Sequence, residues 1–246
     1  EENILIDCGE GIQRQFRKAR LNPCKITKIL LTHYHGDHTY GLLGLLSTLN
    51  SSEYNKTLFI YGPKGIKNYL EEFLKGSRIK FNFDLQIKEV LGKFFETDEF
   101  YLESEKMEHG THTNAYNFII KDKLRIDKKK LEKSGLGKGK FLKDLSEGKD
   151  IIYEGKKFKS KHLTYLEKGK KISIVLDTLF NLRISNFVKE ADIFISEASF
   201  LSEDKGMAKE HLHLTVEEVS KVAKSAKIKN LILTHISQRY EMRLKE

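Results

Sequence analysis

The stretch "LLTHYHGDH", residues 30–38, places three histidines and an aspartate directly after an apolar run. His33 and His35 are two residues apart, so at the end of an extended strand both rings point the same way. The glycine that follows permits a sharp turn before Asp37 and His38. The four side chains therefore form two pairs that face neighbouring points, a pattern typical of metal ligands.

Two such pairs favour two metal ions over one. A single zinc ion takes about four ligands in a structural site, and about three plus a water molecule in a catalytic site. Distant residues therefore have to complete each ion. Other short apolar runs also end in an acidic or histidine residue, at Asp7, Asp177, Glu197 and His235. The candidates for completion are Asp177, His235 and one or two of the remaining histidines.

These apolar runs predict buried strands, because they are rich in Ile, Leu and Val and are not interrupted by polar residues. Helical spacing is present in residues 65–76 and in residues 214–227, where Thr215 is the expected N-cap. Residues 79–120 indicate successive shorter strands. Strands that alternate with helices predict an α/β architecture, in which functional residues gather where strands end and loops begin.

The composition describes a rather polar globular chain of 246 residues, 39% apolar and 32% charged, which fits one large domain or two small ones. It contains no long uncharged apolar run, so we expect no transmembrane helix, and no signal peptide is visible. The chain begins without a methionine and enters an apolar run almost at once, so we expect some N-terminal sequence to be missing. Cys8 and Cys24 form no disulfide framework and suit the reducing cytoplasm.

The charge of the chain favours a polyanionic partner. Lys and Arg number 44 against 35 for Asp and Glu, a net charge of +9, and such an excess is frequent in proteins that bind nucleic acid. Residues 121–171 are densely basic and are punctuated by glycine. This segment by itself is explained equally well by a solvated surface arm and by an arm that grips phosphates.

Beyond these local patterns, the chain resembles a known family. "HYHGDH" matches the HxHxDH motif of the metallo-β-lactamase superfamily. Together with "DCGEG" and "THISQRY", it is similar to the ribonuclease Z family of endonucleases, which remove the 3′ trailer from precursor tRNA. The similar segments are "DCGEGIQRQ" (7–15), "THYHGDHTYGLLGLL" (32–46), "EHGTHTNAYNF" (108–118), "ISEASF" (195–200), "HLHLT" (211–215) and "LILTHISQRY" (231–240).

The resemblance implies a four-layer αββα sandwich of the metallo-β-lactamase fold, with two zinc ions at one edge. It also implies a single domain over residues 1–246, with a basic tRNA-binding arm inserted at about residues 121–150. The N-terminal strand of the family is expected to be missing before Glu1. Manganese and iron accept the same imidazole and carboxylate ligands as zinc.

A set of seven ligands also follows from the resemblance. The first zinc ion is held by His33, His35 and His109, the second by Asp37, His38 and His235, and Asp177 bridges the two. His109 is chosen over His112 by the resemblance alone, because spacing does not separate them.

The implied reaction is hydrolysis of the phosphodiester bond that follows the unpaired discriminator nucleotide of precursor tRNA. Two metal ions activate a water molecule and stabilise both oxygens of an in-line displacement at phosphorus. The tRNA is left with a 3′-hydroxyl, and the trailer with a 5′-phosphate. Asp37 is expected to orient the nucleophile or accept its proton, His213 to give a proton to the leaving oxygen, and Glu197 to orient a histidine from behind.

The basic arm gives this reaction its expected selectivity. Lys138 and Lys140, within "GLGKGK", are expected to contact the phosphate backbone of tRNA without reading its bases. The resemblance further implies a homodimer in the cytoplasm, in which one subunit grips the tRNA that the other cleaves, and no membrane partner.

Two other hypotheses remain open. The chain is alternatively another dinuclear hydrolase of the same superfamily, acting on a small ester, a lactone or a cyclic phosphodiester, which needs no basic arm. The third hypothesis is a non-enzymatic RNA-binding module, and the complete set of ligands argues against it.

Overall fold

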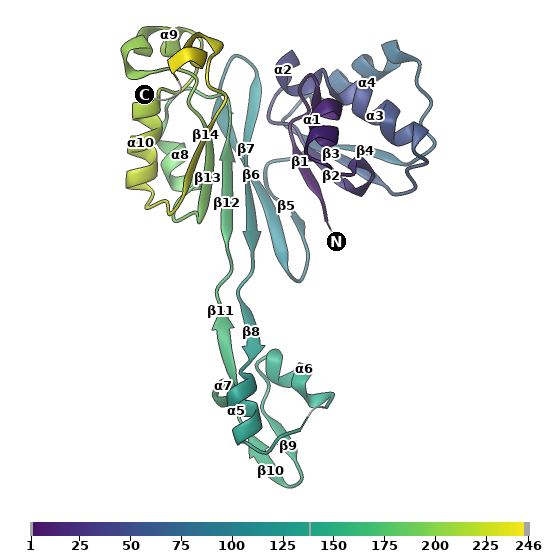
Figure 1. The fold of residues 1–246 in the computed structure, drawn as a ribbon, viewed down its shortest axis with the longest axis vertical. Helices are drawn as coiled ribbons and strands as arrows, with labels where there is room; N and C mark the ends of the chain where they lie inside the picture. Colours follow the sequence, from purple (N-terminus) through teal and green to yellow (C-terminus); the bar gives the residue numbers. More distant parts are fainter. Residues whose placement is uncertain (1, 138, 244–246) are drawn as a thin grey trace.

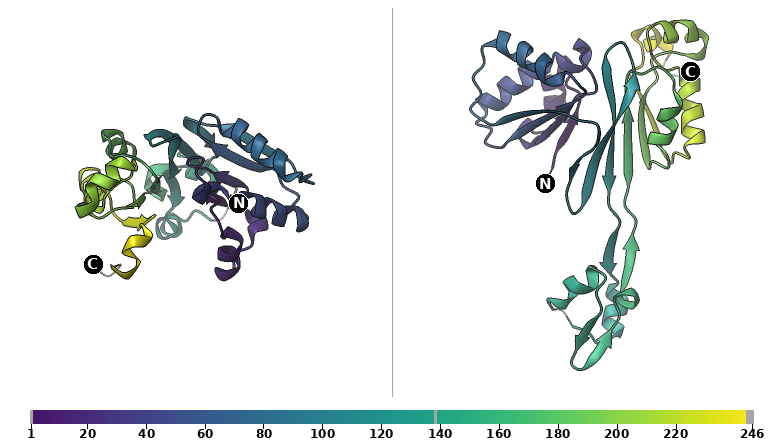
Figure 2. Two further views of the ribbon diagram at one scale, coloured as in Figure 1. Left: turned by 90° about the horizontal axis from the view of Figure 1, so that it is seen from above. Right: turned by 180° about the vertical axis from the view of Figure 1, so that it is seen from behind.

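The protein consists of a main body and a long arm, described by a computed structural model over residues 2–137 and 139–243 (Figure 1). The main body contains two β-sheets that face each other, and helices cover the outer face of each sheet (Figure 2). The order of the layers is therefore helix, sheet, sheet, helix, which confirms the predicted α/β sandwich. Within the described residues, no helix has the length and apolar character that crossing a membrane requires.

The first sheet is parallel, with four strands in the order β1-β2-β3-β4. Parallel strands of this kind are covered on both faces, which explains the unbroken apolar runs in the sequence. Helix α3 packs on this sheet through four fully buried leucines at helical spacing. The elements are β1 (Ile4–Ile6), α1 (Ile12–Lys18), η1 (Pro23–Lys25), β2 (Lys28–Leu30), α2 (Gly36–Thr39), α3 (Leu42–Ser51), β3 (Leu58–Gly62), α4 (Ile66–Ser77) and β4 (Leu85–Glu89).

The second sheet is mixed, with six strands in the order β14-β13-β12-β7-β6-β5. It contains the antiparallel β6–β7 hairpin, whose strands of nine residues each are longer than the short strands predicted for this region. The predicted N-cap Thr215 is confirmed: it begins α10 with a capping box to Glu218. The elements are β5 (Gly92–Glu96), β6 (Phe100–Glu108), β7 (His112–Ile120), β12 (Lys171–Val175), α8 (Leu182–Phe187), β13 (Ile193–Glu197), η2 (Ser202–Asp204), α9 (Lys205–Glu210), α10 (Val216–Ser225), β14 (Leu231–Thr234) and η3 (Gln238–Arg243).

An apolar cluster between the two sheets holds the halves of the body together. Its buried members are Leu30, Tyr61, Phe100, Leu102 and Tyr116. Burying one side chain of this kind contributes about 1.5–3 kcal/mol. Tyr116 also donates a hydrogen bond from Oη to the carbonyl of Leu31 at 2.7 Å. This bond ties the second sheet to the end of β2, just before the histidine-rich loop.

The arm leaves the body as a two-stranded stalk that carries a small head (Figure 1). The stalk strands β8 (Lys123–Ile126) and β11 (Thr164–Glu167) pair antiparallel and are braced by an ion pair between Arg125 and Glu167 at 2.6 Å. The arm extends past residue 150, because β11 has to return along β8 to rejoin the second sheet. The head has its own buried core, and its elements are α5 (Lys128–Lys133), α6 (Phe141–Ser146), β9 (Ile151–Tyr153), β10 (Lys156–Phe158) and α7 (Ser160–Leu163).

Candidate metal centre

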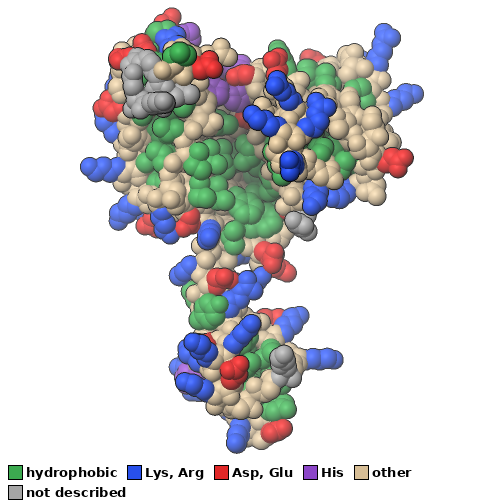
Figure 3. All heavy atoms as spheres, in the orientation of Figure 1, with side chains coloured by type: hydrophobic (Ala, Val, Ile, Leu, Met, Phe, Trp, Pro, Cys, Tyr) green, Lys and Arg blue, Asp and Glu red, His purple; other side chains and the backbone are tan. Residues whose placement is uncertain are grey.

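Histidine side chains gather at the edge of the body where its two halves meet (Figure 3). They lie in loops that follow strands of both sheets and in the turn of the β6–β7 hairpin. The structure thus brings together the seven side chains that the sequence analysis nominated as ligands. Their ligand atoms form two groups, His33, His35, His109 and Asp177 in the first, and Asp37, His38 and His235 in the second.

The first group has the dimensions of a tetrahedral metal site. Nε2 of His33 lies 3.0 Å from Nδ1 of His35, which in turn lies 3.2 Å from Nε2 of His109. Oδ2 of Asp177 lies 3.5 Å from Nε2 of His33. Four ligands placed tetrahedrally at about 2.0–2.1 Å from one zinc ion are about 3.3 Å apart. The observed separations therefore fit a metal ion between these atoms.

The second group has similar dimensions. Nε2 of His38 lies 3.2 Å from Nε2 of His235, and Oδ2 of Asp37 lies 3.4 Å from each of these nitrogens. Asp177 reaches this group as well, because its Oδ1 is 3.3 Å from Nε2 of His235 and its Oδ2 is 3.5 Å from Nε2 of His38. Asp177 thus contacts both groups.

The carboxylate of Asp177 lacks a full set of partners in the protein. Its side chain is 2% exposed, and its Oδ1 accepts no hydrogen bond from the described residues. Burial raises the pKa of Asp177, but the hydrogen bond from His38 and the charges of His235 and His38 outweigh burial and lower the pKa below its usual value. A buried carboxylate with an unsatisfied oxygen, bordered by imidazole nitrogens of both groups, is an arrangement that a metal ion would complete.

The ligand rings are held in the tautomer that a metal ion needs. Nδ1 of His109 donates to the carbonyl of Leu212 at 3.0 Å, so its Nε2 carries a lone pair. Ser199 donates its own hydroxyl hydrogen to Glu197 at 2.7 Å and therefore accepts from Nδ1 of His235 at 2.9 Å. In both rings the N–H faces away from the cluster and the lone pair faces into it.

Asp7 orients a ligand in each group, a role that the sequence analysis did not assign. Its Oδ2 accepts from Nδ1 of His38 at 2.7 Å and from the hydroxyl of Thr32 at 2.8 Å. Because that hydroxyl donates to Asp7, it accepts from Nδ1 of His33 at 3.0 Å. One buried carboxylate therefore fixes rings of both groups. The available signal was the position of Asp7 at the end of an apolar run, like that of Asp177.

The electrostatic environment distinguishes the ring of His33 from the ring of His38. Burial and the neighbouring His38 lower the pKa of His33 to about 2, so this ring is neutral and free to bind a metal. Burial also lowers the pKa of His38, but hydrogen bonds to Asp177 and Asp7 outweigh it and raise the pKa to about 10. The surroundings of His38 thus favour a positive charge at Nε2, which a metal ion supplies as well as a proton does.

The loop that carries Asp7 is packed tightly against the metal-ligand loop. The backbone N–H of Cys8 donates to the carbonyl of His38 at 2.8 Å, and the N–H of Gly41 donates to the carbonyl of Cys8 at 2.9 Å. A Cβ atom on Gly41 would lie 2.0 Å from the carbonyl oxygen of Gly9, so only glycine allows this approach. A Cβ atom on Gly9 would likewise lie 2.0 Å from the carbonyl oxygen of Asp37, so the contact explains the glycines at positions 9 and 41.

A further histidine lies beside the two groups. Nδ1 of His213 is 3.0 Å from Oε2 of Glu197 and 3.3 Å from Oγ of Ser199. The ligand atoms of His213, His235 and Asp177 also lie within 4.8 Å of one another. Burial lowers the pKa of His213, but the hydrogen bond and charge of Glu197 outweigh it and raise the pKa. The contact with Glu197 has the geometry expected of a carboxylate that orients a histidine from behind.

The other nominated or considered residues lie apart from the cluster. His112 is exposed at the start of β7 and joins neither group, whereas His109, at the turn, does. His162 is exposed in the arm, and His211 is exposed and stacks on Phe200. Lys140 is an exposed residue of the arm head. Lys138, nominated together with it, lies outside the described residues.

Comparison with known proteins identifies close relatives of this chain. Residues 1–121 match the metallo-beta-lactamase superfamily. A ribonuclease Z of Nanoarchaeum equitans is 39% identical over 240 residues, which cover 98% of this chain and 76% of the relative. A ribonuclease Z of Oceanobacillus iheyensis is 38% identical over 245 residues, covering 96% of this chain and 79% of the relative.

Solved structures extend the comparison to the fold. The short form of human tRNase Z is 25% identical, with a TM-score of 0.71 over 97% of this chain and 83% of the human chain. The metallo-beta-lactamase fold protein YhfI of Bacillus subtilis is 18% identical, with a TM-score of 0.65 over 96% of this chain and 75% of that chain. The second likeness concerns the fold alone.

The role of Asp7 is tested by Asp7→Asn, which keeps the size of the side chain and tolerates the left-handed backbone at this position, where φ is 55°. An amide cannot accept all the hydrogen bonds that Thr32 and His38 direct at this carboxylate. We expect metal affinity, measured by competition with a chelator, to fall about 10- to 100-fold. The exposed control Asp84→Asn should leave affinity unchanged, and equal affinities for both variants would contradict the role of Asp7.

Proposed function

This chain belongs to the ribonuclease Z family, and from that premise we propose that it is a metal-dependent endoribonuclease that removes the 3′ trailer from precursor tRNA. The observation that carries the proposal is the convergence of seven imidazole and carboxylate side chains on two neighbouring points. Such a set suits the hydrolysis of phosphodiesters. The free thiols of Cys8 and Cys24 suit the cytoplasm as the place of this activity.

We assign two zinc ions to this centre, and manganese or iron are the alternatives that the same ligands accept. His33, His35 and His109 would hold one ion, Asp37, His38 and His235 the other, and Asp177 would contact both. When bound, two such ions supply an activated water molecule and positive charge for an in-line displacement at phosphorus.

The residues around the ions would orient the attacking water and the substrate phosphate. The side chain of Asp37 is 64% exposed, so its carboxylate faces incoming solvent and substrate while it contacts His38 and His235. In that position it orients the water and holds the proton that the water loses. The buried carboxylates of Asp7 and Glu197 keep the rings from turning during the reaction.

His213 is the residue that we propose as proton donor to the leaving oxygen. Glu197 holds its Nδ1, and the ring lines a hollow of about 440 Å³ together with His235 and Arg239. A proton from His213 would neutralise the 3′ oxygen of the discriminator nucleotide as the bond to phosphorus breaks. The tRNA then ends in a 3′-hydroxyl, and the trailer keeps a 5′-phosphate.

The proposed reaction is tested by incubating the protein with 3′-extended precursor tRNA and mapping the cut to the nucleotide. We expect one cut directly after the discriminator nucleotide, a 3′-hydroxyl on the tRNA, loss of cleavage after chelation, and recovery when zinc is returned. Hydrolysis of bis(p-nitrophenyl) phosphate with the precursor tRNA left intact would instead identify a hydrolase of small substrates.

The proton-donor role predicts a specific defect in His213→Ala. Cleavage of precursor tRNA should slow by about 10²- to 10⁴-fold, because the leaving oxygen departs without a proton. Metal content, measured by elemental analysis, should not change. A substrate with a better leaving group should lose much less activity, and His211→Ala, in the same loop, should behave like the unmodified protein. Equal losses on both substrates, or loss of metal, would rule out the donor role.

The arm is the part that we propose for gripping tRNA. Its head lies far from the histidine cluster, at the opposite end of the molecule (Figure 1, Figure 3). Lys128, Lys129, Lys133 and Lys140 are exposed, and none of them forms an ion pair with any described residue. Such lysines can bind RNA phosphates without first breaking an ion pair within the protein. The distance from the site favours a homodimer in which the arm of one subunit holds the tRNA cleaved by the other.

The arm predicts a separation of two activities. Binding of precursor tRNA should weaken when four lysines of the arm are changed to alanine, namely Lys128, Lys129, Lys133 and Lys140. The slope of log affinity against log salt concentration should also become shallower, by roughly 0.7–0.9 for each phosphate that the arm no longer neutralises. Hydrolysis of bis(p-nitrophenyl) phosphate should persist. A control that removes Lys75, Lys80 and Lys224 from the main body should leave tRNA binding nearly intact. Loss of both activities would mean that the arm supports the fold.

A further inference from the structure

A second hollow, of about 350 Å³, lies beside the first ligand group. It opens between the ends of β3 and β4 and the β6–β7 hairpin, whereas the hollow lined by His213 lies by β13 and β14. In Figure 1, β13 and β14 lie on one side of the hairpin and β3 and β4 on the other, so the lining residues place the two hollows on opposite sides of it. The lining residues of the second hollow are Pro63, Lys64, Glu89, Val90, Leu91, Lys106, His112, Thr113 and Asn114.

The second hollow is connected directly to the metal-ligand loop. Tyr34, which stands between the ligands His33 and His35, donates a hydrogen bond from Oη to the carbonyl of Lys64. On the opposite wall, the N–H of Asn114 donates to the carbonyl of Thr32 at 2.9 Å. The hollow therefore borders the loop that carries His33 and His35.

The chemistry of the second hollow fits single-stranded RNA. Most of the surface that lines it is apolar, and its Leu91 is 66% exposed, which suits the face of a base. Lys64 and Lys106 are exposed, and neither forms an ion pair with a described residue. The one acidic lining residue, Glu89, is engaged through Oε1 by the N–H of Gly65 at 2.8 Å. Two lysines in a mostly apolar lining match the phosphates and bases of a short strand.

The direction of the strand follows from the proposed function, on which this inference rests. His213 meets the leaving oxygen, which belongs to the tRNA. The end of the tRNA therefore lies on the side of the hollow that His213 lines. The chain continues past the scissile phosphate toward the other side of the cluster. We propose that the second hollow is the binding site for the first nucleotides of the trailer, held at their phosphates by Lys64 and Lys106.

The test compares two precursor tRNAs, one with a single trailer nucleotide and one with a longer trailer. Lys64→Ala combined with Lys106→Ala should lower kcat/KM for the longer trailer about tenfold, because two charge-assisted hydrogen bonds to phosphate are removed. The single-nucleotide precursor should change less than about twofold, since its trailer has no further phosphate. The salt dependence for the longer trailer should flatten by about 0.7 in logarithmic slope for each phosphate that is no longer neutralised.

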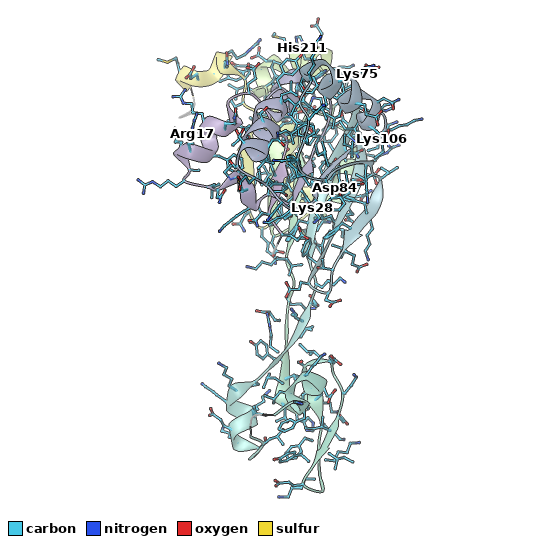
Figure 4. All side chains as sticks on the ribbon, turned by 90° about the vertical axis from the view of Figure 1, so that its right-hand side faces the viewer. Arg17, Lys28, Lys75, Asp84, Lys106 and His211 are labelled. Carbon is cyan, nitrogen blue, oxygen red and sulfur yellow. The ribbon has the colours of Figure 1, made fainter. Side chains whose placement is uncertain are left out.

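Matched variants and substrates separate trailer binding from support of the metal centre and from binding of the tRNA body. Lys75 and Lys80 are exposed lysines outside the hollow, and Figure 4 labels Lys75 together with Lys106. The variant that combines Lys75→Ala with Lys80→Ala should behave like the unmodified protein on both precursors. The variant that combines Lys64→Arg with Lys106→Arg should keep the kcat/KM of the unmodified protein for the longer trailer. Inhibition by mature tRNA and hydrolysis of bis(p-nitrophenyl) phosphate should not change in any variant.

Several outcomes would overturn the inference. Equal losses on the two precursors, or weaker inhibition by mature tRNA, would assign the hollow to the tRNA body. Loss of bis(p-nitrophenyl) phosphate hydrolysis would mean that the lysines support the metal centre, and no loss on either precursor would mean that the hollow binds no trailer. These results are distinguishable from failure of the proposed function, in which the unmodified protein does not cut either precursor after the discriminator nucleotide.

Discussion

The fixed orientation of the ligand imidazoles is the constraint on which the rest of this site depends. Two buried carboxylates impose it on His33, His38 and His235: Asp7, after β1 of the first sheet, and Glu197, at the end of β13 in the second. Each works through a neighbouring hydroxyl, Thr32 or Ser199, that passes the hydrogen bond on to a further ring. The site therefore needs the two sheets in a fixed relative position, and the apolar cluster between them maintains that position.

The sequence predicts the part of this site that is local. In "HYHGDH" four ligands are only a few bonds apart, so their grouping follows from strand and turn geometry alone. The partners of Asp7 do not follow in this way, since they depend on the parallel pairing of β1 with β2. His109 and His112 show the same limit: one lies at the hairpin turn and the other on the strand, a difference that spacing does not reveal.

The arm shows a different limit of prediction from the sequence. The densely basic segment, residues 121–171, includes both stalk strands, whereas the arm implied by the resemblance, at about residues 121–150, leaves out the return strand β11. What defines the arm physically is its own core of Leu136, Leu145, Ile151 and Leu163, separated from the clusters of the body by the stalk. Because the head buries its own apolar side chains, changes to its surface lysines need not disturb the metal centre.

Three residues of the site have a strained backbone where they leave the sheets. Asp7, Asp177 and His235 have positive φ values of 55°, 29° and 54°, and each lies within two residues of the end of a strand. Such conformations cost about 1–3 kcal/mol for a residue other than glycine. They also turn the chain sharply, so that the ends of β1, β12 and β14 aim these side chains at one region instead of continuing outward. Glycine would relieve the strain but remove a side chain that the site uses, so these positions keep a strained conformation that the hydrogen bonds of the site offset.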